Sequence, residues 1–240
     1  MVYRRTWMIV FSGFFEPLLY LFSLGFGLKV FVGTVPSPAG GTLDYASFIA
    51  PALLAASAMN GAVYDAGNVF WKLRYNRVYD AVVSTPVSAP AVALGETAWG
   101  LFRGLLYCIC FLIVMTALGL VHSWWGVLAL PAAFLTGFAF AGIGVAASTW
   151  MRTWQDFEFI QLATLPMFLF SATFFPLSAY PIVIEWFVRV TPLYRAIQLL
   201  RGLTTGAIHW TLLVDVIYLA ALGTVGVWLS SRRIHKLLLS

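Results

Sequence analysis

The sequence predicts an all-α membrane protein of six transmembrane helices. Three observations lead to this fold class: 61% of the 240 residues are hydrophobic, only 10% are charged, and the hydrophobic residues form runs long enough to cross a bilayer. A water-soluble domain usually carries about 25% charged residues, so a soluble fold of this composition has too little polar surface. A helix needs about 20 mostly apolar residues to cross the hydrocarbon core, where backbone groups must be hydrogen-bonded internally.

Six such runs follow one another along the chain. They cover residues 8–32, 46–70, 92–120, 125–150, 159–177 and 210–230. The first run is too long for a cleavable signal peptide and lacks a small-residue cleavage site, so we expect it to remain as a span. Between the first two spans, residues 35–41 are rich in proline and glycine and are expected to form an outer turn.

The basic residues lie mostly on one side of the predicted spans. Nine of the fourteen lysines and arginines precede the first span or follow the second, fourth and sixth: Arg4, Arg5, Lys72, Arg74, Arg77, Arg152, Arg232, Arg233 and Lys236. Because cytoplasmic loops carry an excess of lysine and arginine, we expect both termini and the 72–90 loop in the cytoplasm. These loops explain the net charge of +5, which gives no reason to expect nucleic-acid binding.

The loop after the second span contains a stretch that can form a short helix on the membrane surface. Arg74, Arg77 and Asp80 lie on its polar face, and residues 84–86 end it with a proline. On loop chemistry alone, a charged loop held by lipid head groups is favoured over a docking helix for a soluble partner.

The segment between the fifth and sixth spans is expected to be re-entrant or interfacial. The amphipathic run 182–190 is too short to cross, residues 191–195 interrupt it, and a second short helix is expected at 196–202. The alternative is a surface hairpin whose Arg189, Arg195 and Arg201 meet lipid phosphates.

Five ionisable residues fall inside predicted spans: Glu16, Asp65, Glu96, Arg103 and Asp215. Ionisable groups are costly in lipid and are functional candidates by default. Glu96 and Arg103 are two turns apart on one helix face, so they can share a polar network. The candidates for a substrate path or intramembrane polar network are Glu16, Tyr20, Glu96, Arg103 and Asp215.

Small residues recur at helical spacing at Gly100 and Gly104 and at Ala133, Gly137 and Ala141. Such faces allow helices to approach closely, and packing within one bundle is favoured over a contact between two copies.

Enzyme chemistry is not expected in this chain. It has no glycine-rich phosphate loop ending in Lys-Ser or Lys-Thr, so we do not expect it to hydrolyse ATP. His122, His209 and His235 have no partner at metal-ligand spacing, so no metal site is predicted.

The run at residues 16–28, Glu-Pro-Leu-Leu-Tyr-Leu-Phe-Ser-Leu-Gly-Phe-Gly-Leu, resembles the first span of ABC type-2 transporter permeases. Within that family it is most similar to the branch of nodulation-factor, or lipo-oligosaccharide, exporters. Residues 45–62, 94–99, 168–177 and 192–201 resemble later pieces of the same family in the same order. The chain departs from the family at its start, where only residues 1–6 precede the first span in place of an amphipathic interfacial helix.

The resemblance implies a single six-span permease domain over residues 1–240, located in the bacterial plasma membrane. It implies a second permease copy, as a homodimer or with a close paralogue, and two copies of a separate ATP-binding subunit. ATP and Mg²⁺ would bind to that subunit, and this chain would hold no cofactor.

The resemblance also assigns roles to two segments. It identifies residues 73–85 as a coupling helix, which reverses the preference drawn from loop chemistry, with contacts to the ATP-binding subunit from Arg74, Tyr75, Arg77, Val78, Asp80 and Ala81. It identifies residues 178–205 as outer re-entrant helices that close the exit, with an outer gate formed by Pro181, Trp186, Pro192, Tyr194 and Arg195.

The function that follows is outward export of an amphiphile, such as a lipid-linked oligosaccharide or glycolipid. One alternative is an efflux permease of the same family for a hydrophobic drug or antibiotic. Two others are a proton-coupled secondary transporter and a structural or biogenesis protein with no cargo.

Overall fold

The structure, a computed structural model, describes residues 15–74, 89–153 and 155–239. The first described residues, 15–20, are helical and lead into a π-helix. The elements that follow are η1 (Leu21–Phe26), α2 (Lys29–Val32), β1 (Thr34–Pro36), β2 (Thr42–Asp44), α3 (Tyr45–Arg74), α5 (Ala89–Ala117), η2 (Trp124–Leu128), α6 (Ala129–Ser148), α7 (Asp156–Phe170), η3 (Leu177–Ala179), α8 (Ile182–Val190), α9 (Pro192–Thr205) and α10 (Thr211–Leu239).

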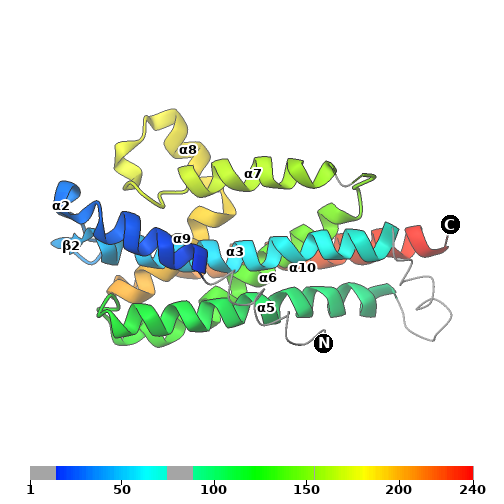
Figure 1. Cartoon of the computed structure of the whole chain (residues 1–240), viewed down its shortest axis with the longest axis horizontal. Coiled ribbons are helices and arrows are strands. Elements are labelled where there is room, and N and C mark those ends of the chain that lie inside the picture. The colour runs from blue at the N-terminus through cyan, green and yellow to red at the C-terminus, as the bar shows by residue number, and fades with distance from the viewer. Residues whose placement is uncertain (1–14, 75–88, 154, 240) are drawn as a thin grey trace.

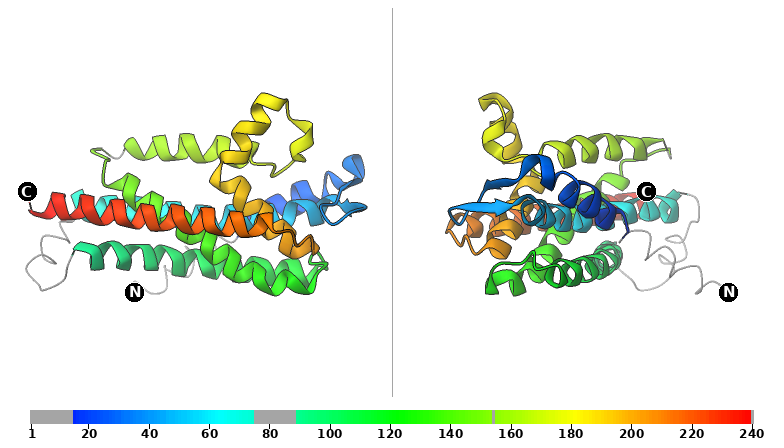
Figure 2. Two further views of the ribbon diagram at one scale, coloured as in Figure 1. Left: turned by 180° about the vertical axis from the view of Figure 1, so that it is seen from behind. Right: turned by 60° about the vertical axis from the view of Figure 1, so that its left-hand side comes forward.

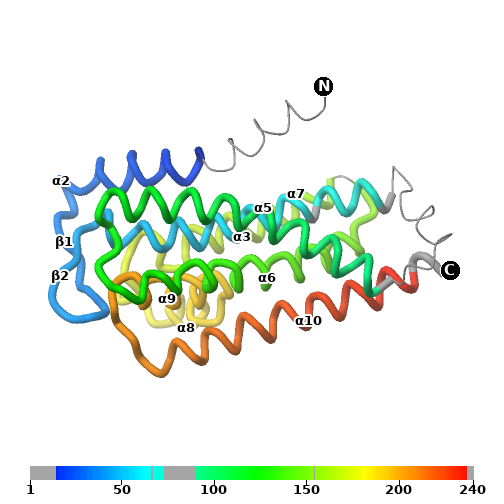
Figure 3. Tube along the Cα trace, turned by 90° about the horizontal axis from the view of Figure 1, so that it is seen from below, coloured from blue at the N-terminus to red at the C-terminus, as the bar shows by residue number. Residues whose placement is uncertain are grey.

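Four long helices, α3, α5, α6 and α10, lie side by side along the length of the molecule (Figures 1 and 3). Helix α3 is the most buried of the four, since 94% of its most apolar stretch is buried, compared with 22% for α10. This burial indicates that α3 lies at the centre of the bundle. Apolar and small residues occur on every side of α3, which is the pattern of a helix buried all round.

Glycines set the distance between these helices. A Cβ on Gly61 of α3 would lie 2.8 Å from the Cα of Gly104 in α5, and one on Gly226 of α10 would lie 2.4 Å from the backbone of Gly142 in α6. No side chain fits at such distances, so glycine is what lets these backbones touch. Gly137 of α6 likewise packs against α3 and α5, and the predicted packing of small residues within one bundle is confirmed.

Among the described residues, five helical stretches are long and apolar enough to cross a membrane. They are Phe15–Val32, Tyr45–Lys72, Pro90–Ala117, Trp124–Ser148 and Thr211–Lys236. These stretches correspond to the predicted first, second, third, fourth and sixth spans. The described strands form one two-stranded hairpin, so the prediction of an all-α membrane protein is confirmed.

The predicted fifth span, residues 159–177, is wrong in extent. Helix α7 has 15 residues and is about 22 Å long at 1.5 Å per residue, shorter than the hydrocarbon core of about 30 Å. It ends at Phe170, and bends follow from Ser171 to Phe175. Ala172 has a left-handed φ of 57°, a conformation that a right-handed helix cannot contain.

The hairpin and the short helices gather toward one end of the molecule, away from the C-terminal end of α10 (Figure 1). The predicted outer turn at 35–41 closes the β1–β2 hairpin, in which Thr34 pairs with Asp44. Helix α8 has the predicted bounds of 182–190. Helix α9 begins earlier than predicted, because Thr191 alone is extended and Pro192 takes the first helical position, where proline fits well.

Helices α7 and α8 lie along one side of the bundle in both views of Figure 2. No residue of α7 is buried, and in α8 only Val188 is. Helix α9 is the opposite case, with ten buried residues that pack against α3, α6 and α10. The two short helices of the predicted re-entrant segment therefore differ in burial.

Candidate functional site

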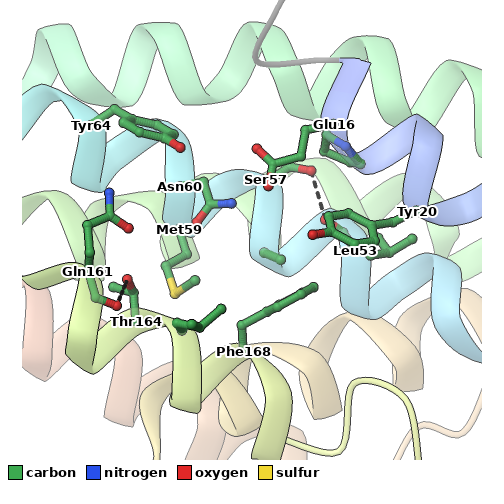
Figure 4. A pocket seen from close by; sticks show the side chains of 13 residues that line it. Glu16, Tyr20, Leu53, Ser57, Met59, Asn60, Tyr64, Gln161, Thr164 and Phe168 are labelled. Atoms are coloured by element: carbon green, nitrogen blue, oxygen red, sulfur yellow. Dashed lines mark hydrogen bonds between the residues drawn. The ribbon is translucent and has the colours of Figure 1, made fainter.

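Polar side chains from three segments line a pocket of about 100 Å³ between the helical segment at residues 15–20, α3 and α7. Figure 4 shows their side chains around the space between these segments. We call it the Glu16 pocket, and its polar and aromatic lining consists of Glu16, Tyr20, Ser57, Asn60, Tyr64, Gln161, Thr164 and Phe168.

Helix geometry explains why these residues meet. Ser57, Asn60 and Tyr64 are spaced at i, i+3 and i+7, so they share one face of α3. Gln161, Thr164 and Phe168 repeat this spacing on α7, and Glu16 and Tyr20 are one turn apart. The sequence analysis predicted Glu16 and Tyr20 and missed the pocket residues of α3 and α7. The polar residues at helical spacing within the second and fifth predicted spans could have identified them.

The pocket offers unused hydrogen-bonding groups. Ser57 Oγ donates to the carbonyl oxygen of Leu53 over 2.7 Å, and Thr164 Oγ1 donates to that of Gln161 over 3.2 Å, so both hydroxyl protons are used within their own helices. The side chains that make no hydrogen bond or ion pair with any other described residue are those of Glu16, Tyr20, Asn60, Tyr64 and Gln161. Polar groups of this kind inside a bilayer point to a ligand.

Glu96 and Arg103 lie elsewhere, at the contact between α5 and α3. Arg103 Nη1 is 3.0 Å from Asp65 Oδ1, and Lys72 Nζ is 2.9 and 2.8 Å from the two carboxylate oxygens of Glu96. The polar network expected for Glu96 and Arg103 includes α3: each of the two pairs with a residue of α3, because the two helices carry opposite charges at the same seven-residue spacing and run antiparallel.

Asp215 is far from the Glu16 pocket along the chain and pairs with a residue of the predicted outer gate. Arg195 Nη1 of α9 is 3.0 Å from Asp215 Oδ1 of α10. Both residues, with Tyr194 and Gln198, line a second pocket of about 310 Å³. The structure thus joins one member of the predicted substrate path to two members of the predicted gate.

The other predicted gate residues are not part of this pocket. Pro181 precedes α8, Trp186 is 70% exposed on α8, and Pro192 occupies the first turn of α9.

Arg201 is a buried residue that the sequence reading placed at lipid phosphates in one alternative. It is 4% exposed, which makes that alternative wrong for this residue. Its guanidinium donates to the carbonyl oxygens of Phe48 in α3 and Ala172 in the bend after α7, and it lies 3.8 Å from the centre of the Phe48 ring.

The predicted coupling helix lies mostly outside the described residues. Arg74 is the last residue of α3, whereas the other predicted contacts are not described: Tyr75, Arg77, Val78, Asp80 and Ala81. The end of α3, the α6–α7 connection and the end of α10 all lie toward the same end of the molecule (Figure 1).

Comparison with known proteins places the chain among transporters. Residues 1–204 match the family of ABC-2 type transporters. Nodulation protein J of Rhizobium leguminosarum bv. trifolii is 34% identical over 194 residues, which are 80% of this chain and 72% of that protein. Nodulation protein J of Sinorhizobium fredii is 31% identical over 211 residues, 83% of this chain and 78% of the relative. The apolar helices and these matches together show that the chain is a membrane permease that belongs to the ABC-2 type transporter family.

Proposed function

We propose that this chain is the permease subunit of an ATP-driven exporter that moves an amphiphile outward across the bacterial plasma membrane. The observation that carries the proposal furthest is the Glu16 pocket, where polar side chains gather between apolar helices and five of them have no hydrogen-bond or ion-pair partner among the described residues. An amphiphile has one polar end and one apolar end, and this pocket offers a place for the polar end beside lipid. Glycolipids are the cargo class that we favour.

The contacts between α3 and α5 support a route for the driving force. The loop between Arg74 and Ala89 joins these two helices, and the pairs Asp65–Arg103 and Lys72–Glu96 fasten them together close to that loop. A push on the loop would therefore move α3 and α5 as one unit. Helix α3 also carries Ser57, Asn60 and Tyr64, so this motion would reshape the pocket wall.

The energy for the motion would come from a partner. A conformational change requires a ligand that binds its two states with different affinity, and we assign that role to ATP on a separate subunit that docks at residues 73–85. Two copies of that subunit and a second copy of this permease complete the proposed assembly. The apolar helix α7 supports a second copy, because none of its residues is buried by the described part of this chain.

Docking is tested with a variant in which Arg74, Arg77 and Asp80 are replaced by alanine. We expect it to lose co-purification with the ATP-binding subunit, while Arg152→Ala, a charge removal in the α6–α7 connection, keeps it. Pairing that is unchanged in the triple variant would contradict the coupling-helix assignment.

Transport is tested in reconstituted vesicles. Outward flux of a fluorescent glycolipid should require both the partner subunit and ATP. Uphill movement by this chain alone would contradict the proposal and favour the proton-coupled alternative, which predicts loss of transport on neutralising Glu16 or Asp215.

A further inference from the structure

We propose that the Glu16 pocket binds a substituted ammonium group at the polar end of the cargo and excludes a phosphate. This inference rests on the proposed function, since it names the chemistry of the cargo end that enters the pocket. It follows from the charge, the aromatic rings and the volume of the pocket.

The charge of the pocket has one sign. Among the described residues that line it, Glu16 is the charged one, and none of them is a lysine, arginine or histidine. The three other intramembrane carboxylates that the sequence singled out each have a cation beside them: Asp65 has Arg103, Glu96 has Lys72 and Asp215 has Arg195. Glu16 has no such partner in the described residues.

Within a bilayer, a carboxylate that has no counter-charge among the described residues is costly, and an arriving cation would supply one. A phosphate would bring a like charge to Glu16 and find no basic side chain among the described lining residues.

Three aromatic rings favour the same ligand. Tyr20, Tyr64 and Phe168 line the pocket, and the ring centroids of Tyr20 and Phe168 are 5.8 Å apart. Aromatic faces attract cations within about 6 Å of the ring centre, and aromatic cages are the common means of binding alkylated ammonium groups. A neutral sugar would use the rings but leave the carboxylate without a counter-charge.

The volume limits what enters. The pocket measures about 100 Å³, less than the roughly 150 Å³ of a cavity that holds benzene and well below the roughly 300–1,000 Å³ of sites for drug-sized ligands. It therefore takes the end of a head group, while the apolar part of the cargo stays outside. The carboxamides of Asn60 and Gln161, which make no hydrogen bond to another described residue, can bond adjoining hydroxyl or carbonyl groups.

The test compares three probes with the same eight-carbon chain: octyltrimethylammonium, octyl glucoside and octyl phosphate. Their binding to the full chain in lipid nanodiscs is measured by calorimetry without nucleotide or partner subunit. We expect octyltrimethylammonium to bind at least about tenfold more tightly than octyl phosphate, as a favourable charge contact replaces a repulsive one.

Glu16→Gln keeps the size of the side chain and removes its charge. It should weaken octyltrimethylammonium binding by about tenfold and leave octyl glucoside unchanged. Glu158→Gln removes a carboxylate from α7 outside the pocket and should change neither. Tyr20→Leu, which removes a ring but no charge, should weaken the ammonium probe by a smaller factor.

The proposal is overturned if octyl phosphate binds as well as the ammonium probe, if Glu16→Gln binds all three probes as the parent chain does, or if no probe binds. Since no ATP or partner is used, these results leave the proposed ATP-driven export standing. Loss of ATP-dependent flux in the vesicle assay would instead count against export and leave the binding result standing.

Discussion

Arg201 of α9 donates a hydrogen bond over 3.0 Å to the carbonyl oxygen of Ala172, the residue with left-handed backbone that follows α7. The same guanidinium bonds the carbonyl oxygen of Phe48 in α3. Non-helical backbone at membrane depth persists only where its polar groups find partners in the protein. Arg201 therefore holds the bend after α7 in place, together with Tyr45, whose hydroxyl donates to the carbonyl oxygen of Phe174 over 3.2 Å.

Replacing Arg201 is predicted to destabilise the fold. Arg201→Ala removes the hydrogen bonds to the carbonyl oxygens of Phe48 and Ala172. We expect the free energy of unfolding to fall by about 3 kcal/mol and Tm to fall by roughly 6–12 °C. Arg201→Lys should restore little, because an ammonium lacks the planar fork that spans two carbonyl groups. The measurement is thermal unfolding in detergent. Arg189→Ala, at an exposed position on α8, is the control and should keep the parent Tm.

The contact between α6 and α10 is predicted to tolerate no side chain at Gly226. The added Cβ of Gly226→Ala would lie 2.4 Å from the backbone of Gly142, which forces the helices apart at a cost of about 1–3 kcal/mol. Gly95→Ala on α5 meets no atom within 4 Å and should be stabilising by about 0.5–1 kcal/mol. Thermal unfolding of both variants checks the pair, and an equal response would contradict the close approach.

The buried pair of Asp65 and Arg103 is predicted to be strongly coupled. Arg103→Met leaves the Asp65 carboxylate, which is 4% exposed, without its paired cation. We expect the free energy of unfolding to fall by about 3 kcal/mol. In a double-mutant cycle with Asp65→Asn, the two losses should fall short of additivity by about 1–3 kcal/mol.

A double-mutant cycle on the more exposed pair Lys29 and Asp44 serves as the comparison. It should give a coupling free energy under about 1 kcal/mol. Additive losses at Asp65 and Arg103 would show that the pair is not a unit.

The connection between α6 and α7 is predicted to loosen in acid. The backbone N–H groups of Arg152 and Thr153 donate to the carboxylate of Asp156, which lowers its pKa below the ordinary value. Because the folded-state pKa is lowered, this anchoring is complete at neutral pH and is lost as the pH falls below about 4.

Hydrogen exchange at the Thr153 amide, corrected for its intrinsic rate, measures the effect. Asp156→Ala should abolish the protection at neutral pH as well, whereas Glu158→Gln should preserve it. Protection that stays constant into acid would refute the anchoring.

Features encoded in contiguous residues were predictable from the sequence. The apolar runs predicted α3, α5, α6 and α10, since length and composition decide whether a helix crosses a bilayer. The short amphipathic run at 182–190, interrupted at residues 191–195, predicted α8. Glu16 and Asp215 were marked by their charge alone.

Features that depend on distant residues were not predictable in this way. The end of α7 at Phe170 depends on Arg201, which arrives from another helix. The partners of Glu96 and Arg103 lie on α3, and no pattern within α5 names them. The Glu16 pocket combines residues from three separate segments, so its volume and lining emerge only when the helices pack.

The π-helix η1 lies directly after the two pocket residues of the first segment. A π-turn holds one more residue than an α-turn. The side chains before it therefore point in directions that a regular α-helix would not give them relative to the side chains after it. Deletion of a single residue such as Phe22, which is exposed, would return the segment to regular α-helix and rotate everything ahead of it by about 100°. Glu16 and Tyr20 would then face away from α3. If the Glu16 pocket binds the cargo as proposed, its specificity is sensitive to a one-residue change in spacing that alters no side chain of the pocket.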